Sequence, residues 1–172
     1  MSNYPKINLF PDKNQKGIWR FSDYLSPLDD HYKLSLNEGN TEEISVFENL
    51  IFKREDLNPT GSLKDRGMAY LISRTYQDNQ KNLVISSSGN AAVSAAKYCS
   101  LAKINLFVFV SPEINEKKLA LIESSGAKVV KTPRPVSDSS KFSRKNGYLN
   151  IRPSLNSFGD EGYQTIAFEL AA

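Results

Sequence analysis

The chain has 172 residues, of which 40% are hydrophobic and 10% aromatic, so it is long enough to bury the core of one ordinary domain. Its 22 basic and 19 acidic residues are spread along the sequence and give a net charge of +3, which excludes a basic arm for nucleic acid or an acidic tail. No apolar run approaches the ~20 residues of a membrane span, and residues 1–10 lack the pattern of a signal peptide. We therefore expect a cytoplasmic protein with no nucleic-acid partner and no membrane segment.

One histidine and one cysteine restrict the chemistry further. Cys99 cannot form an internal disulfide, and it lies in the apolar-patterned segment 91–101, where a buried and unreactive thiol is expected. His31 lies in a polar loop and is expected to face solvent. Neither a zinc-type metal site nor a Ser-His-Asp triad is predicted.

The first part of the chain has little periodicity. Residues 1–43 read as an arm that packs on a body, with a short helical turn predicted at residues 17–25. Residues 44–47 and 50–53 are β-branched and aromatic, which predicts a hairpin or two edge strands.

From residue 63 onward, helical and strand patterns alternate. The spacing between strands suits right-handed βαβ crossovers, and residues 104–110 are apolar enough for a strand that is covered on both faces. We therefore predict an α/β fold, a parallel sheet with helices on both faces. The predicted helices are 63–78, 91–101, 115–124, 136–146 and 160–172, and the predicted strands are 83–85, 104–110, 127–131 and 148–151.

A first candidate site is the stretch 58–67, N-P-T-G-S-L-K-D-R-G. Residues 58–61 fit a type I turn, and Ser62 with Asp65 fits a capping box at the start of the next helix. Lys64 then lies in the first helical turn, where the helix dipole and any burial favour the neutral amine that attacks an aldehyde. The alternative is an ordinary solvated lysine.

A second candidate site is the polar loop 86–91, between a buried strand and a helix N-terminus. Free amides and the helix dipole there favour an anion such as a carboxylate, although a plain serine-glycine cap would use the same residues. If both sites lie at the C-terminal edge of one parallel sheet, the Lys64 amine and the Asn90 side chain should lie roughly 4 to 9 Å apart.

Residues 58–67 closely resemble the lysine segment of fold-type II pyridoxal-phosphate enzymes, and most nearly that of threonine synthases, N-P-T-G-S-[FL]-K-D-R-G. The resemblance implies that Lys64 is the catalytic residue and holds pyridoxal 5′-phosphate as a Schiff base. Residues 87–90 resemble the family's S-[ST]-G-N. This implies that Ser87, Ser88, Gly89 and Asn90 bind the substrate carboxylate, and that Asn90 also hydrogen-bonds the cofactor's 3′ oxygen.

Three other segments extend the resemblance over nearly the whole chain. Residues 17–28 are similar to the family's W-R-[FY] lead-in, and residues 36–41 are similar to G-E-G-N-T-P, with Asn37 and Glu42 as departures. Residues 162–170 resemble G-Q-K-T-I-A-[FY]-E-[IL], which opens the second and larger domain in that family. The implied division is an arm (1–43), a small α/β domain (44–151) and the start of a second domain (152–172). We expect the N-terminal half of a family member, and the last helix shows no capping residue.

Two features bear on the cofactor and the substrate. The family's glycine-rich phosphate loop has no counterpart here, since no two glycines are adjacent. The family's N-P-x-R-x-E-G segment corresponds to residues 156–162, where Asn156 matches but Gly159 replaces the arginine that helps hold a substrate phosphate. Lys53 and Arg152 could compensate, and we count Lys53 and Asn156 among the candidate substrate-binding residues.

The resemblance implies a lyase that converts O-phosphohomoserine to threonine and phosphate, with Lys64 as the main acid-base group. Two alternatives stay open. Gly159 and Glu42 fit a cysteate synthase-like or threonine dehydratase-like relative, and the missing glycine-rich loop fits a non-catalytic α/β module. The expected partner is a small amino-acid substrate. The oligomeric state is undetermined, with a homodimer as one candidate.

Overall fold

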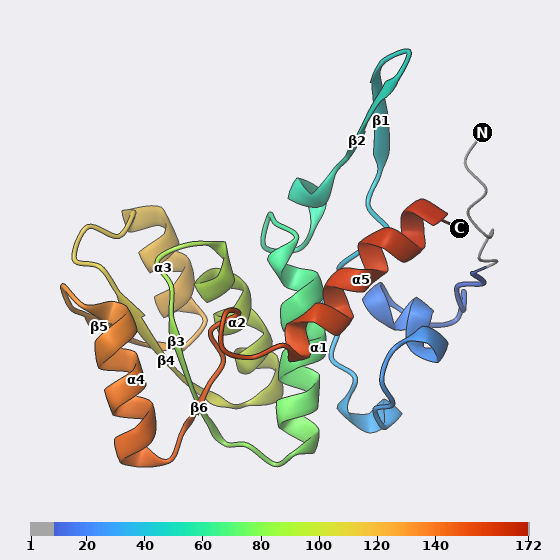
Figure 1. Cartoon of the computed structure of the whole chain (residues 1–172). Coiled ribbons are helices and arrows are strands. Elements are labelled where there is room, and N and C mark those ends of the chain that lie inside the picture. Colours follow the sequence, from blue (N-terminus) through green and yellow to red (C-terminus); the bar gives the residue numbers. More distant parts are fainter. Residues whose placement is uncertain (1–8, 172) are drawn as a thin grey trace.

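The computed structural model describes residues 9–171 (Figure 1), so residues 1–8 of the predicted arm lie outside the described part. A four-stranded parallel sheet forms one end of the molecule. Its strands are β3 (Asn82–Ser86), β4 (Asn105–Val110), β5 (Lys128–Lys131) and β6 (Leu149–Asn150), in the order β5-β4-β3-β6. The register pairs Ile85 with Val108, Phe109 with Val130 and Val84 with Asn150. The predicted parallel sheet is confirmed.

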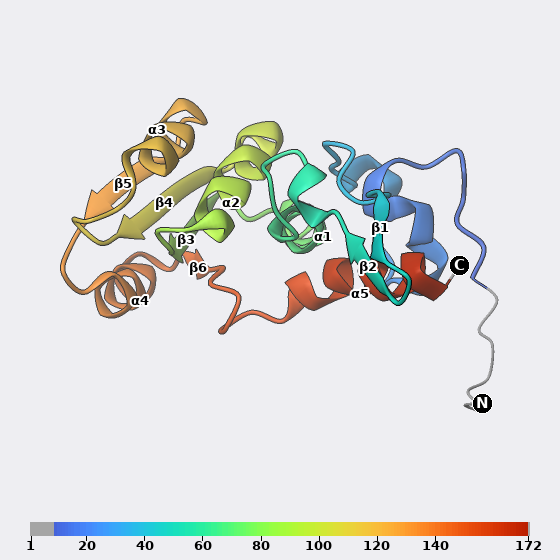
Figure 2. The same cartoon turned by 90° about the horizontal axis from the view of Figure 1, so that it is seen from above.

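Three helices cover the two faces of this sheet. The crossovers are α2 (Asn90–Ala102), α3 (Glu116–Ser124) and α4 (Pro135–Asn146). Figure 2 shows α2 and α3 on one face and α4 on the other. The arrangement follows from right-handed crossovers. The chain moves outward from β3 to β4 and β5, and then returns past β3 to β6, which places the last crossover helix on the opposite face.

Small residues allow α1 (Lys64–Gln77) to pack closely on α2. Ala92 and Ala95 of α2 are fully buried, as are Met68 and Ile72 of α1, and all four belong to one core with Leu83 and Ile85 of β3. This packing explains why the alanine-rich pattern of residues 91–101 predicted a buried helix correctly. Partly buried aromatic side chains pack between the sheet and α4, where the Phe107 and Phe142 ring centroids lie 5.0 Å apart.

The arm packs on α1 and on the final helix, α5 (Phe158–Ala171). It contains two 3-10 helices, η1 (Gly17–Tyr24) and η2 (Asp30–Tyr32). Trp19 is almost fully buried, and its indole N–H donates to the Leu34 carbonyl at 2.7 Å. Glu38 is also buried and accepts a 2.7 Å hydrogen bond from the Tyr98 hydroxyl of α2. Burial raises the pKa of Glu38, so the arm is joined to the body by a carboxyl that protonates more readily than an exposed one.

Strands β1 (Glu43–Phe47) and β2 (Leu50–Lys53) form an antiparallel hairpin that projects from the body (Figure 1). The register shifts between Ser45 and Phe47, as at a β-bulge. The hairpin forms its own two-stranded sheet, apart from the parallel sheet, at the start of the predicted small domain, 44–151. The short 3-10 helix η3 (Glu55–Leu57) leads from it to the lysine turn.

The two residues that the sequence placed outside any active site lie as expected. Cys99 is fully buried, and burial raises the pKa of its thiol, whereas His31 is exposed and contacts Tyr32 edge-on. Over residues 9–171, no cluster of three or more His, Cys, Asp or Glu side chains is arranged to hold a metal ion. None of the helices in that range is long and apolar enough to cross a membrane.

Candidate active site

The lysine turn forms as predicted, but its cap does not. The Gly61 N–H donates to the Asn58 carbonyl at 2.8 Å, and Gly61 adopts a φ of +80° that favours glycine. Helix α1 begins at Lys64 itself, one residue later than the capping box requires, and the Ser62 hydroxyl accepts only a long hydrogen bond of 3.3 Å from the Lys64 N–H. The capping-box prediction is therefore wrong.

The Asp65 carboxylate instead fastens the turn to two other segments. It is fully buried and accepts hydrogen bonds from the Thr60 N–H and the Thr60 hydroxyl, both at 2.6 Å. A third donor is the Ser94 hydroxyl of α2, also at 2.6 Å. These three short hydrogen bonds hold both the turn that precedes Lys64 and helix α2 against the Asp65 carboxylate.

Lys64 is half-buried at the start of α1, and its amine does not lie in open solvent. The Nζ atom lies 5.0 Å from the ring centroid of Tyr163, which α5 contributes. No sequence pattern connects these two residues, because they lie far apart in the chain.

The loop 87–90 lies at the point where the strand order reverses. The chain leaves β3 toward β4 on one side and later returns to β6 on the other, and ligands of open α/β sheets bind at such a switch point. The loop is held by its own serines. The Ser87 hydroxyl accepts from the Gly89 N–H at 3.2 Å, and the Ser88 hydroxyl accepts from the Ser111 N–H at 3.1 Å. These bonds leave the first turn of α2 without a side-chain cap, so it can accept an anion.

Ser86 adds an independent indication of a ligand. Its hydroxyl is buried at the end of β3 and has no hydrogen-bond partner among the described residues. A buried hydroxyl without a partner is costly, and a bound polar group can remove that cost. Asn90 is exposed at the first residue of α2, where its side chain is free to meet a ligand.

The lysine turn and the loop come together at one edge of the molecule. Helices α1 and α2 lead into and out of β3 and pack side by side, so both begin near the C-terminal end of that strand. The hydrogen bond between Asp65 in the first turn of α1 and Ser94 in the second turn of α2 joins the two helices directly. The structure therefore places Lys64 and the loop 87–90 at the same edge of the sheet.

Two of the other predicted site residues are engaged elsewhere. The Lys53 amine donates to the Thr41 carbonyl at 2.8 Å and forms salt bridges with Glu43 at 3.2 Å and with Glu169 at 3.0 Å. The Asn156 side-chain oxygen accepts from the Phe158 N–H at 3.0 Å, at the start of α5. Both residues have structural partners, and their binding roles stay predictions.

A buried ion-pair network lies next to the lysine turn, and the sequence did not predict it. Arg66 is fully buried and pairs with Glu55 at 2.7 Å and with Glu169 at 2.8 Å. Burial alone would raise the pKa of Glu169, but its hydrogen bonds to Arg66 and to the Asn40 N–H lower it to about 2. The network joins the arm, η3, α1 and α5, so it sets how the final helix sits against Lys64.

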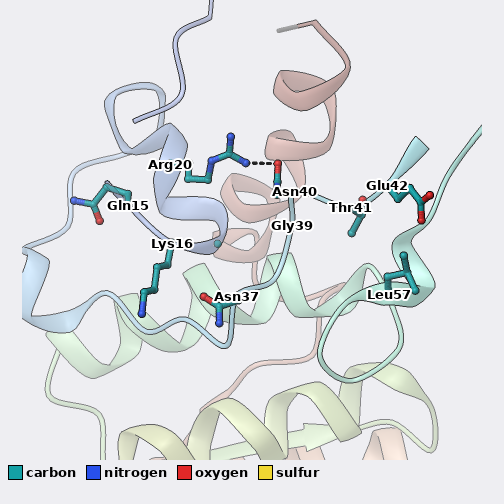
Figure 3. Close-up of a pocket in the computed structure, with 10 residues that line it drawn as sticks. Gln15, Lys16, Arg20, Asn37, Gly39, Asn40, Thr41, Glu42 and Leu57 are labelled. Atoms are coloured by element: carbon teal, nitrogen blue, oxygen red, sulfur yellow. Dashed lines mark hydrogen bonds between the residues drawn. The ribbon is translucent and has the colours of Figure 1, made fainter. Parts of the chain in front are cut away.

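A cavity of about 520 Å³ lies within the arm, between the start of η1 and the segment 37–42 (Figure 3). Arg20 hydrogen-bonds Asn40 across it, and neither Lys64 nor the loop 87–90 lines it. One residue that lines the cavity, Asn37, departs from the family pattern, and its backbone conformation accounts for the departure. Asn37 has a φ of +68°, a left-handed conformation that glycine adopts freely and that asparagine tolerates better than most residues.

A family model and several curated proteins match most of this chain. The family model described as "Pyridoxal-phosphate dependent enzyme" matches residues 35–172. The threonine synthase of Methanocaldococcus jannaschii is 33% identical to this chain, and the match covers 92% of this chain and 42% of that protein. The threonine synthase of Mycobacterium tuberculosis is 32% identical, and the match covers 89% of this chain and 46% of that protein. The chain thus spans less than half the length of these curated relatives.

Solved structures show the same fold. A pyridoxal 5′-phosphate-dependent aspartate racemase is similar with a TM-score of 0.65 and 29% identity, over 70% of this chain and 38% of that one. Serine racemase from Dictyostelium discoideum is similar with a TM-score of 0.63 and 28% identity, over 70% of this chain and 40% of that one. The family description and these relatives indicate pyridoxal 5′-phosphate as the cofactor. The chain belongs to the pyridoxal-phosphate-dependent enzymes of fold type II, of which it represents an N-terminal portion.

Proposed function

We propose that the protein is a pyridoxal-phosphate-dependent lyase of the threonine synthase type, which converts O-phosphohomoserine to threonine and phosphate. The observation that carries this proposal is the placement of Lys64. It begins α1 beside the uncapped N-terminus of α2, and the hydrogen bond between Asp65 and Ser94 fixes the two helix starts relative to each other.

The residues at this edge fit the cofactor and an amino-acid substrate. Lys64 would hold the cofactor covalently, and Asn90 would hydrogen-bond its ring oxygen. The unpartnered hydroxyl of Ser86 and the uncapped start of α2 supply donors for a polar or anionic ligand. When bound, the cofactor withdraws electrons from the substrate's Cα, which makes the proton on that carbon acidic.

The chain's own residues have separate tasks in this proposal. The amides of the loop 87–90 bind the substrate carboxylate and so orient Cα toward Lys64. The Lys64 amine, once free, takes the proton from Cα and moves protons at Cβ. Asp65 keeps the amine near the loop, because it ties the lysine turn to α2.

A second candidate function is favoured because neither Gly159 nor Lys53 offers a free cation to a substrate phosphate. Gly159 provides no cation at the position of the family's arginine, and Lys53 is already paired with Glu169 and Glu43. An amino-acid substrate without a phosphate, as in a dehydratase or racemase, needs no such cation. The aspartate and serine racemases among the similar structures are consistent with this reading.

Steady-state assays of the protein expressed from its complete coding sequence distinguish the two candidate functions. Formation of threonine and phosphate from O-phosphohomoserine at about 1 to 1000 per second would support the first function and exclude the second. Turnover of serine, threonine or aspartate without turnover of O-phosphohomoserine would support the second.

A further inference from the structure

The Lys64 amine contacts an aromatic face that nothing in the proposed chemistry has used so far. Its Nζ lies 5.0 Å from the centroid of the Tyr163 ring, within the roughly 6 Å over which an ammonium is attracted to an aromatic face. Tyr163 belongs to α5, a helix distinct from those that carry the lysine turn and the loop 87–90. A third element therefore reaches the reactive amine.

Backbone packing sets the position of this ring. A Cβ added to Gly162 would lie 2.0 Å from the Arg66 carbonyl oxygen, so α5 touches the backbone of α1 where only glycine fits. A Cβ added to Gly67 would lie 2.3 Å from Cζ of Tyr163 and 2.7 Å from its hydroxyl. The missing side chain of Gly67, three residues after Lys64, is thus what leaves room for the ring.

The electrostatic surroundings keep the phenol neutral. Burial, together with the nearby carboxylates of Asp160 and Asp65, raises the pKa of Tyr163 to about 12. The ring therefore presents the same uncharged face to Lys64 across the neutral range. The Asp65 carboxylate, one residue after Lys64, is occupied by Thr60 and Ser94, so the aromatic face is the contact that holds the amine.

We infer that Tyr163 is a positioning residue that holds the free Lys64 amine on the α5 side of the candidate site, within reach of the substrate. This inference rests on the proposed function for its role in catalysis. An amine that is released and recaptured in each turnover has several rotatable bonds, and a fixed resting place shortens its return. The contact itself is a property of this chain and can be tested without the cofactor.

Four variants test the contact in matched pairs. Tyr163→Leu removes the aromatic face, whereas Tyr163→Phe keeps the face and removes only the hydroxyl. Gly67→Ala leaves Tyr163 unchanged but forces its ring away, because the clash falls on the far end of a rotatable side chain. Gly159→Ala is the control, since a Cβ there meets Gly67 and Tyr163 at ordinary distances of 3.6 and 3.7 Å.

The measurement is competitive acetylation of the cofactor-free protein with limiting acetic anhydride, followed by mass spectrometry of the lysine peptides. The exposed Lys97 serves as the internal reference. Tyr163→Leu and Gly67→Ala should each raise the labelling of Lys64 relative to Lys97 by at least about twofold. Tyr163→Phe and Gly159→Ala should leave the ratio near that of the unchanged protein.

Unchanged labelling in both Tyr163→Leu and Gly67→Ala would overturn the inference, as would Tyr163→Phe behaving like Tyr163→Leu. In the holoenzyme, Tyr163→Leu should lower kcat while KM stays close to its original value, because a resting place for the amine affects turnover more than substrate binding. If Lys64 proves not to bind the cofactor, the proposed function fails, but the labelling result still decides whether the ring holds the amine.

Discussion

Asp65 of α1 and Ser94 of α2 are joined by a hydrogen bond of 2.6 Å between two fully buried side chains. This bond connects the helix that begins with the candidate catalytic lysine to the helix that begins with the candidate substrate loop. It therefore holds the two halves of the proposed site at a fixed separation.

Removing the Ser94 hydroxyl should weaken both the fold and the site. Ser94→Ala deprives a buried carboxylate of one of its three donors, which should lower the free energy of unfolding by about 1.5 to 3 kcal/mol. Ser100→Ala is the matched control, because Ser100 is exposed on the same helix, and it should change stability by less than about 0.5 kcal/mol. Urea unfolding of both variants makes the comparison. Equal stabilities would mean that the bond is not important for the fold.

The ion pair between Arg66 and Glu169 should make stability depend on pH in the acid range. The pKa of Glu169 falls from an ordinary 4.5 to about 2 in the folded protein. Its contribution is therefore present above pH about 4.5 and is lost as the pH falls toward about 2. We expect Glu169→Gln to be less stable than the unchanged protein at neutral pH, and the difference should shrink over that range.

The control for this experiment is Glu123→Gln, since Glu123 is exposed on α3 and forms no salt bridge in the described part of the chain. Its stability should differ little from that of the unchanged protein at every pH. A Glu169→Gln difference that stays constant from pH 7 to pH 2 would contradict the proposed role of the ion pair.

The sequence was sufficient to predict the helices and strands that leave a local pattern. The apolar run 104–110 and the alanine-rich segment 91–101 became β4 and α2 within one residue at each end, because burial on both faces and close helix packing leave a clear pattern. The turn at residues 58–61 also formed as expected. The fold class followed from the alternation of these elements.

Contacts between distant residues could not be predicted in the same way. Asp65 has the spacing of a capping box, but three donors from Thr60 and Ser94 compete for its carboxylate and prevail. The burial of Arg66 depends on Glu55 and on Glu169, which lies about a hundred residues later in the chain. The contact between Lys64 and Tyr163 has the same origin, since it requires the glycines at which α1 and α5 meet.

Asn90 should affect the cofactor and leave the fold intact. Its side chain is exposed at the first residue of α2, so Asn90→Ala should not change the midpoint of thermal unfolding of the cofactor-free protein. Loss of the hydrogen bond that we propose between Asn90 and a charged ring oxygen should weaken cofactor binding by about 1 to 3 kcal/mol, measured by titration of the visible absorbance. Asn105→Ala, at the start of β4 and the opposite edge of the sheet, should leave binding unchanged. Equal cofactor affinities of the two variants would mean that Asn90 does not bind the cofactor.

The most direct test concerns Lys64 itself. The protein expressed from its complete coding sequence is incubated with pyridoxal 5′-phosphate, reduced with borohydride and digested, and the modified peptide is identified by mass spectrometry. We expect one pyridoxyl group on Lys64 and the loss of that adduct in Lys64→Ala. An adduct on another lysine, or none at all, would contradict it.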